Sequence, residues 1–147
     1  MSLRQPNLKM SKSHPDPRSR ILITDSPEDI RAKIMAAMTD SVPGISYDRE
    51  NRPGLANLIE IISHFEKDGK SCVDIAHEHE PLSIREFKGK VIDCLLSNLS
   101  KIRTEYERLL AAENNIYLDE VAMKGANQAR ANAEATMAIL RKAIGLV

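Results

Sequence analysis

Residues 83–110, SIREFKGKVIDCLLSNLSKIRTEYERLL, hold a long helical pattern that indicates the fold class. Ser83 and Glu86 match the S-x-x-E signature of a helix start, in which each side chain accepts a hydrogen bond from a free backbone N–H. Apolar residues then return every three or four positions on one side; they are Ile84, Phe87, Val91, Leu95, Leu99, Ile102, Tyr106 and Leu109. The pattern predicts a helix of roughly 30 residues that Asn114-Asn115 ends.

Two further helices are predicted before this run. Residues 26–29, SPED, are a start signal, because serine caps a helix, proline suits its first position and aspartate completes a capping box. The apolar residues after this signal are Ile30, Ile34, Ala37 and Met38. Residues 41–52 read as a loop. The second helix follows Pro53 and ends at Asp68-Gly69; its apolar stripe is Leu55, Leu58, Ile59, Ile62 and Phe65.

The remaining elements are predicted from equally local signals. Ser71 with Asp74 predicts a short helix that stops before Pro81. The Ala-rich residues 118–144 predict a last helix, with Gly145 at its C-terminal cap. The one candidate strand is RILIT, residues 20–24. The sequence therefore predicts an all-α helical bundle.

Composition narrows the class of protein. The chain has 147 residues, 42% hydrophobic and 29% charged, which fits one folded domain. It has 21 basic and 21 acidic residues, so it is not a simple polycation, and 3% aromatics disfavour a base-stacking platform. No apolar window is long enough to span a membrane, so no membrane partner is expected. Two cysteines, Cys72 and Cys94, favour a reducing compartment.

The N-terminal segment has a different composition. Residues 1–24 hold a single acid, Asp16, three prolines and five basic residues, which are Arg4, Lys9, Lys12, Arg18 and Arg20. Prolines argue against a helix, so this segment is predicted to be a mobile cationic loop or tail before the bundle.

The pentapeptide KMSKS, residues 9–13, carries the most chemical information. Lys9 and Lys12 supply compact positive charge, while serine hydroxyls such as Ser13 and loop N–H groups donate hydrogen bonds, a set that suits a polyphosphate. A mobile loop of this kind stabilises a departing pyrophosphate at the transition state. The plain alternative is a solvated basic segment with a chance match.

The residues around KMSKS extend the pattern. They are HPDP at 14–17, ITDS at 23–26, TDS at 39–41, YD at 47–48, RPGLANL at 52–58, FKGKV at 87–91 and GANQARA at 125–131. This order resembles the C-terminal part of bacterial-type tryptophanyl-tRNA synthetases, which are class I aminoacyl-tRNA synthetases, and most closely their mitochondrial relatives. The resemblance covers nearly the full chain. One departure is His14, where relatives often carry an acid.

The resemblance implies an activity and its participants. The family joins tryptophan to tRNA(Trp) with ATP, through an aminoacyl-adenylate, and Mg²⁺ is bound to the nucleotide. By motif, Lys9, Met10, Lys12 and Ser13 become ATP-binding residues, and Lys9 and Lys12 become the catalytic ones. The full-length enzymes are homodimers. The expected compartment is the mitochondrial matrix, with bacterial cytoplasm as the alternative.

The resemblance also implies two parts of this chain. Residues 1–25 would end the catalytic domain, and residues 26–147 would form a helical, anticodon-binding type of domain. Lys124, Asn127 and Arg130 are candidate tRNA contacts, because they lie three residues apart on one helical face and offer donors. A solvated helix face packed with small Ala residues explains these three equally well.

Motifs of the catalytic half are missing from this sequence. None of its histidines, His14, His64, His77 and His79, begins an H-x-G-H motif, and its glycines form no phosphate-binding turn. We therefore expect a C-terminal fragment without the α/β Rossmann half, inactive by itself. No metal site is expected either, because His77 and His79 point to different sides of a helix and no further ligand completes a set with Cys72.

Two other functions remain open at this point. A standalone helical RNA-binding module would bind tRNA in a salt-sensitive way without ATP. A structural helical protein would use its first 20 residues as an organelle-targeting presequence, which sequencing of the mature N-terminus would reveal.

Overall fold

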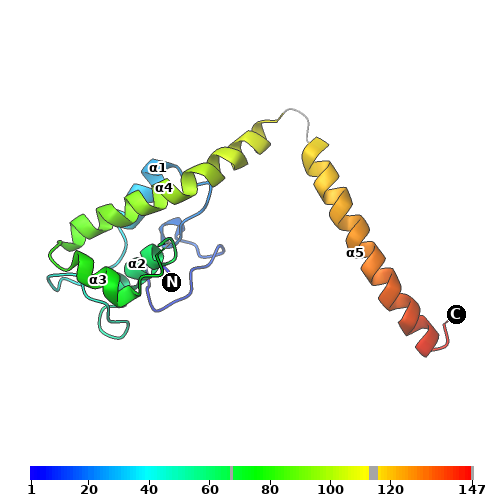
Figure 1. Cartoon of the computed structure of the whole chain (residues 1–147), viewed down its shortest axis with the longest axis horizontal. Coiled ribbons are helices and arrows are strands. Elements are labelled where there is room, and N and C mark those ends of the chain that lie inside the picture. The colour runs from blue at the N-terminus through cyan, green and yellow to red at the C-terminus, as the bar shows by residue number, and fades with distance from the viewer. Residues whose placement is uncertain (67, 113–115, 147) are drawn as a thin grey trace. The chain divides into compact units, whose positions relative to one another are not determined.

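The computed structural model describes residues 1–66, 68–112 and 116–146, and these ranges are helical or irregular throughout (Figure 1). The elements are η1, a 3₁₀ turn (Pro17–Ser19), α1 (Pro27–Met35), α2 (Pro53–Ser63), α3 (Cys72–His79), α4 (Ile84–Ala111) and α5 (Ile116–Ala143). The all-α prediction is confirmed for the described residues. The strand predicted at residues 20–24 is wrong, because the backbone there turns locally, with Asp25 N donating to Leu22 O at 3.1 Å.

The chain divides into two compact units, residues 1–106 and 107–147. The first holds α1, α2, α3 and most of α4, and the second holds the end of α4 together with α5. The boundary predicted between residues 25 and 26 stays a prediction; in the structure, residues 1–25 belong to the first unit.

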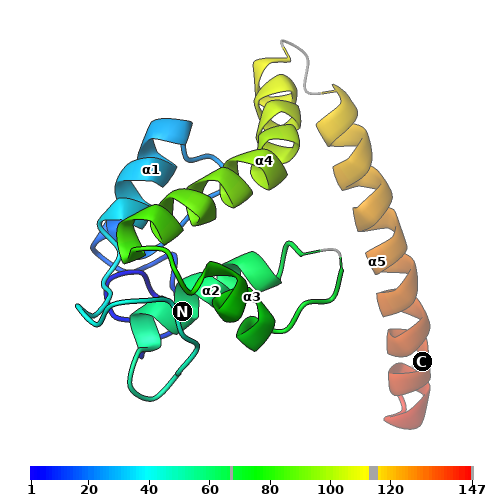
Figure 2. The same cartoon turned by 60° about the vertical axis from the view of Figure 1, so that its left-hand side comes forward.

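One hydrophobic core forms the first unit, and α1, α2 and α3 gather around the N-terminal half of α4 (Figures 1 and 2). All four helices and the N-terminal segment contribute side chains to this core. Each fully buried aliphatic side chain contributes roughly 1.5–3 kcal/mol relative to an exposed one. The core residues are Leu3, Ile30, Ile34, Ala37, Ile45, Leu55, Leu58, Ile59, Ile62, Ile75, Ala76, Phe87, Val91, Ile92 and Leu95.

The helix starts predicted at Ser26, Ser71 and Ser83 are confirmed by reciprocal capping hydrogen bonds. At the start of α4, Ser83 N donates to Glu86 Oε2 at 2.8 Å, and Glu86 N donates to Ser83 Oγ at 3.2 Å. The same arrangement starts α1 with Ser26 and Asp29, and α3 with Ser71 and Asp74. Local sequence was sufficient here because both partners of each cap lie within one turn.

The helix ends differ more from expectation. α2 stops at Ser63, well before Asp68-Gly69, and the chain after it tightens into a turn in which Phe65 N donates to Ile62 O at 2.9 Å. Gly145 does cap α5, with a φ of 74° that favours glycine, and Leu146 N reaches back to Arg141 O. The end predicted at Asn114-Asn115 lies outside the described residues.

α1 also ends earlier than its apolar pattern predicts, at Met35. Ala37 is nevertheless buried, whereas Met38 is exposed. The carbonyl groups of Met35 and Ala37 accept hydrogen bonds from Lys88 Nζ, at 3.2 and 2.8 Å, and this long-range contact fixes the end of the helix.

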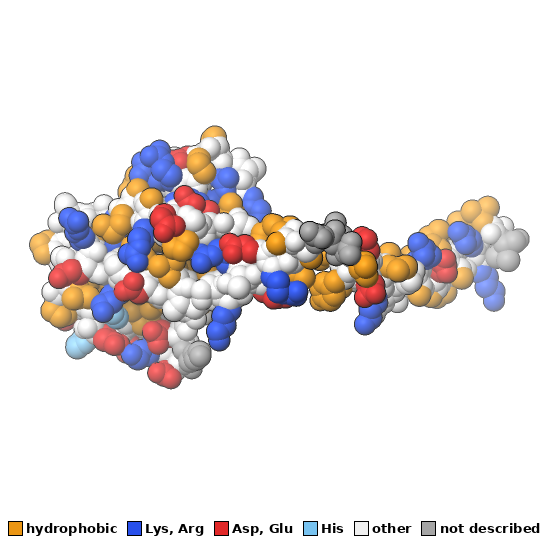
Figure 3. All heavy atoms as spheres, turned by 90° about the horizontal axis from the view of Figure 1, so that it is seen from above, with side chains coloured by type: hydrophobic (Ala, Val, Ile, Leu, Met, Phe, Trp, Pro, Cys, Tyr) orange, Lys and Arg blue, Asp and Glu red, His pale blue; other side chains and the backbone are white. Residues whose placement is uncertain are grey.

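The apolar stripe of α4 is buried only in its first half. Phe87, Val91 and Leu95 belong to the core, whereas Ile102 and Tyr106 are 51% and 42% exposed. Figure 3 shows acidic and basic side chains interspersed on the face in view, in line with the zero net charge. Among the described residues, no helix combines the length and the apolar character that a membrane crossing requires.

Candidate functional site

The segment that carries KMSKS is a loop with a buried base. Leu3 N donates to Ser19 O at 2.9 Å, and this backbone bond closes residues 4–18 into a loop. Leu3 is 1% exposed and Ser19 is 0% exposed, and Met38 N donates to Leu3 O at 2.8 Å. Of the two predicted alternatives, a mobile loop or a tail, the tail is wrong for these flanks, because both residues are buried in the first unit.

The tip of the loop, residues 9–13, presents polar groups to solvent. Lys9, Ser11, Lys12 and Ser13 are exposed, and the two serine hydroxyls lie 3.0 Å apart. Met10 is half-buried and packs against the core, so it anchors the tip near its start. Two ammonium groups and two hydroxyls on one short turn form a site that suits an anion with several charged oxygens.

Asp16 braces the loop next to the tip. It accepts hydrogen bonds from Arg18 N, Nε and Nη2 at 2.9, 3.0 and 3.2 Å, and Arg4 Nε lies 3.7 Å away. The hydrogen bond from the Arg18 side chain holds the pKa of Asp16 below its ordinary value. Among the described residues, neither Lys9 nor Lys12 has an acidic partner, so their charges stay available for a ligand.

The loop base is tied to α1 from both directions. On one side, Arg4 Nη1 donates to Ala36 O at 2.8 Å and caps the last turn of the helix. On the other side, Asp25 Oδ2 accepts from Leu22 N at 2.8 Å and from Lys33 Nζ at 2.5 Å. Both side chains of the Asp25–Lys33 pair are almost fully buried. These contacts fix where the loop stands relative to the helices.

Lys88 extends this support to α4. Its ammonium group reaches the end of α1, as described above, and burial lowers the pKa of Lys88 through desolvation. The loop base, α1 and α4 therefore form one connected frame.

Arg52 organises the loop that contains Thr39-Asp40-Ser41. Its guanidinium donates to both carboxylate oxygens of Asp40 and to the Val42 and Gly44 carbonyl groups. These hydrogen bonds from Arg52 lower the pKa of Asp40. Met38 N, which donates to Leu3 O, lies just before the loop that Arg52 organises. The shape of that loop therefore also supports the base of the KMSKS loop.

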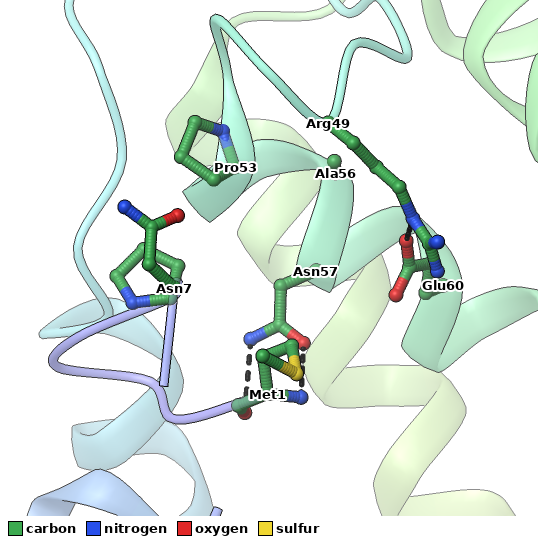
Figure 4. Close-up of a pocket in the computed structure, with 8 residues that line it drawn as sticks. Met1, Asn7, Arg49, Pro53, Ala56, Asn57 and Glu60 are labelled. Atoms are coloured by element: carbon green, nitrogen blue, oxygen red, sulfur yellow. Dashed lines mark hydrogen bonds and ion pairs between the residues drawn. The ribbon is translucent and has the colours of Figure 1, made fainter. Parts of the chain in front are cut away.

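A hollow of about 340 Å³ lies beside the upstream flank of the loop (Figure 4). Four of the residues that line it are paired with each other: Arg49 Nε donates to Glu60 Oε1, and the amino group of Met1 donates to Asn57 Oδ1 at 2.9 Å. Residues 9–13 do not line it. The hollow and the exposed lysines are therefore separate features, and the lysines define the candidate site.

The three candidate tRNA contacts lie on α5, in the second unit. Lys124, Asn127 and Arg130 are all exposed, and Arg130 Nη1 donates to Asn127 Oδ1 at 3.2 Å. Their shared face agrees with helical spacing. A role in tRNA binding stays a prediction, as does the solvated-face alternative. In the described part of the chain, no group of three His, Cys, Asp or Glu side chains is placed to hold a metal ion.

Sequence reasoning missed the residues that hold the loop. Leu3 and Arg4 gave no local signal, because their partners Ser19 and Ala36 are far along the chain. Asp16 did carry one: an aspartate directly before a proline is a helix-cap pattern, and here it caps η1.

Comparison with known proteins identifies the class. The family model "tRNA synthetases class I (W and Y)" matches residues 1–100. The chain belongs to this family of class I aminoacyl-tRNA synthetases, those for tryptophan and tyrosine.

Individual relatives narrow the similarity to the tryptophan enzymes and confirm the resemblance. The chain is 37% identical to the tryptophan–tRNA ligase of Bacillus anthracis, over 99% of its own length and 43% of that protein's. It is 39% identical to the mitochondrial tryptophan–tRNA ligase of Schizosaccharomyces pombe, over 99% of its own length and 39% of that protein's. The chain thus spans about two fifths of the length of these relatives.

Solved structures agree with this similarity. The tryptophanyl-tRNA synthetase of Mycoplasma pneumoniae matches with a TM-score of 0.83 and 25% identity, over 100% of this chain and 43% of that one. The synthetase of Campylobacter jejuni, solved with ADP and tryptophan, matches with a TM-score of 0.65 and 26% identity, over 99% of this chain and 44% of that one.

Proposed function

We propose that this chain forms the nucleotide loop and the helical part of a tryptophan–tRNA ligase. Such a ligase activates tryptophan with ATP to tryptophanyl-adenylate and transfers it to tRNA(Trp). The observation that carries the proposal is the exposed KMSKS tip, on a base that is anchored in the core. Its Lys9 and Lys12 have no acidic partner among the described residues. Family membership and the similarity to tryptophan–tRNA ligases support the same conclusion.

The tip residues have roles that follow from the reaction. A carboxylate oxygen of tryptophan attacks the α-phosphorus of ATP, the bond from that phosphorus to its bridging oxygen breaks, and pyrophosphate leaves with the electron pair. Lys12 and Lys9 stabilise the charge that builds on the leaving group. Ser13 and the loop N–H groups donate hydrogen bonds, and Met10 holds the tip against the core. A hydroxyl of the tRNA then attacks the adenylate carbonyl carbon, and AMP leaves.

Mg²⁺ would enter this reaction bound to the phosphates of the nucleotide. The nearest acid to the tip along the chain, Asp16, is engaged by Arg18 and Arg4. The loop is therefore suited to hold phosphate oxygens, and the nucleotide itself would supply the ligands that the ion needs.

The chemistry further requires parts that this chain does not supply. We infer that an α/β catalytic domain provides the tryptophan pocket and the H-x-G-H motif, and that the helical residues 26–147, with Lys124, Asn127 and Arg130, serve tRNA binding. We also propose that the complete enzyme is a homodimer in the mitochondrial matrix, with bacterial cytoplasm as the alternative. Imaging of the tagged protein in its own cell distinguishes the two compartments.

Tryptophan-dependent exchange of pyrophosphate with ATP tests the proposal. In the complete ligase that carries this sequence, Lys12→Ala should lower exchange by about 10²-fold or more, the loss expected for a transition-state charge contact. Lys101→Ala, an exposed lysine on α4, is the matched control and should leave exchange unchanged. The 147-residue chain alone should show no exchange. Unaltered exchange in Lys12→Ala would contradict the proposed role of the loop.

A further inference from the structure

The residue that follows the KMSKS tip, His14, has an orientation that its neighbours determine. Asp16 N donates to His14 Nδ1 at 3.1 Å. The Asp16 carbonyl oxygen lies farther from the same ring nitrogen, at 3.4 Å. Since a backbone N–H requires an acceptor, Nδ1 acts as the acceptor, and the neutral ring carries its proton on Nε2.

The backbone of His14 is held as firmly as its ring. Arg20 Nη1 donates to His14 O at 2.8 Å, and His14 N donates to Ser11 O at 3.4 Å. The second bond belongs to the turn that carries Lys12 and Ser13. The imidazole is therefore preorganised beside the tip, in contrast to the long lysine side chains.

The other ring nitrogen of His14 is left open. Nε2 makes no hydrogen bond to any described residue, and the buried polar atoms without a partner in the described part of the chain are Ser19 Oγ and Arg20 Nε. Since His14 is half-buried and Nε2 is not one of these buried atoms, its N–H is an accessible donor on an otherwise fixed ring.

On the basis of the proposed function, we propose that His14 is an additional phosphate-binding residue, whose Nε2–H donates to an oxygen of the pyrophosphate part of ATP beside Lys9 and Lys12. A neutral N–H that meets a charged oxygen forms a charge-assisted hydrogen bond. Because Asp16 N has already fixed the ring, little side-chain entropy is lost when the ligand arrives. The site would therefore combine two mobile ammonium groups with one fixed donor.

Two substitutions separate this role from a structural one. His14→Asn removes the Nε2–H but keeps a side-chain oxygen that can accept from Asp16 N two residues on, as Asn does in an Asx turn. His14→Ala removes both interactions. His77→Ala is the matched control, because His77 is exposed on α3, away from the loop in sequence.

The full 147-residue chain contains its own spectroscopic reference. His79 Nδ1 lies 2.8 Å from Ile75 O and must donate to it, so His79 has the opposite tautomer to His14. Ring-nitrogen NMR should show the Nε2–H form for His14 and the Nδ1–H form for His79. Titration with Mg²⁺-pyrophosphate should then shift the ring signals of His14 and leave those of His79 in place.

The affinity for pyrophosphate decides the proposal. We expect His14→Asn and His14→Ala each to weaken binding about tenfold, with an unfolding midpoint of His14→Asn equal to that of the wild type. Wild-type affinity in His14→Asn overturns the proposal, even if His14→Ala binds weakly. If Lys12→Ala alone weakens binding, the inference on His14 fails and the proposed function stands. If the chain binds no pyrophosphate, the inference on His14 fails, whereas the proposed function is decided by the exchange assay of the complete ligase. If neither Lys12→Ala nor His14→Asn changes binding, the inference on His14 and the proposed role of the loop both fail.

Discussion

The base and the tip of the KMSKS loop differ in what holds them. At the base, Leu3 and Ser19 are buried and joined through their backbones, and Arg4 ties the loop to α1. At the tip, Lys9 and Lys12 are exposed and have no acidic partner among the described residues. The charged side chain at the base is therefore engaged in a contact that holds the loop in place. The charged side chains at the tip remain exposed where a ligand would bind. Substitutions at the two ends should affect different properties.

The largest loss of stability is expected at the base. Leu3→Ala should lower the free energy of unfolding by about 2–5 kcal/mol, since it removes a fully buried side chain and leaves a cavity. Leu8→Ala, in the same loop but 54% exposed, should change it by no more than about 0.5 kcal/mol. Urea unfolding of both variants measures the difference. Equal losses would show that the base is not anchored as described.

A smaller loss of stability is expected at the start of α2, which packs against a residue that holds the loop base. A Cβ on Gly54 would overlap the carbonyl oxygen of Met38, the residue that bonds to Leu3. Gly54→Ala should therefore cost about 1–3 kcal/mol through overpacking. Gly89→Ala, on α4 with open space around it, should instead stabilise the protein by roughly 0.5–1 kcal/mol. Thermal unfolding of the pair tests the sign as well as the size.

The ion pair behind the base should make stability depend on pH. Arg52 lowers the folded-state pKa of Asp40, so the unfolded chain takes up the proton first as the pH falls. The contribution is complete above the ordinary aspartate pKa of about 3.9 and is lost as the pH falls through the lower folded value. Asp40→Asn should lower the free energy of unfolding by about 1–2 kcal/mol at pH 7. When the pH falls below about 4, the free energy of unfolding should decrease less in this variant than in the wild type. Urea unfolding at pH 7 and pH 3 compares the two; parallel acid losses would contradict this account.

The smallest effect on stability is expected at the tip. Lys12→Ala should change the free energy of unfolding by no more than about 0.5 kcal/mol, because the side chain is exposed and has no acidic partner in the described part of the chain. The same substitution is expected to lower pyrophosphate exchange strongly in the complete ligase. A Lys12→Ala variant that unfolds much more easily would mean that the tip is part of the frame, and the contrast with the base would disappear.

The helices α4 and α5 show which properties a sequence pattern predicts and which it does not. Each has 28 residues, and each was predicted from its helical pattern. Yet α4 buries Phe87, Val91 and Leu95 in the core, whereas no described residue of α5 is buried. Periodicity indicates that a helix forms, but burial depends on which other segments pack against it.

The sequence by itself determined the all-α class, the helix starts and the KMSKS tip, because these signals lie within a few neighbouring residues. The tertiary structure decided the rest: that Leu3 belongs to the core, that Lys33 pairs with Asp25 inside the protein, and that Lys88 meets the end of α1. The partners of Leu3 and Lys88 lie far from them along the chain. No helical period or short motif can predict a contact between residues so far apart in the sequence. The sequence was sufficient to locate Lys9 and Lys12 in a loop motif. The frame of loop base, α1 and α4 that holds this loop forms only when the chain folds.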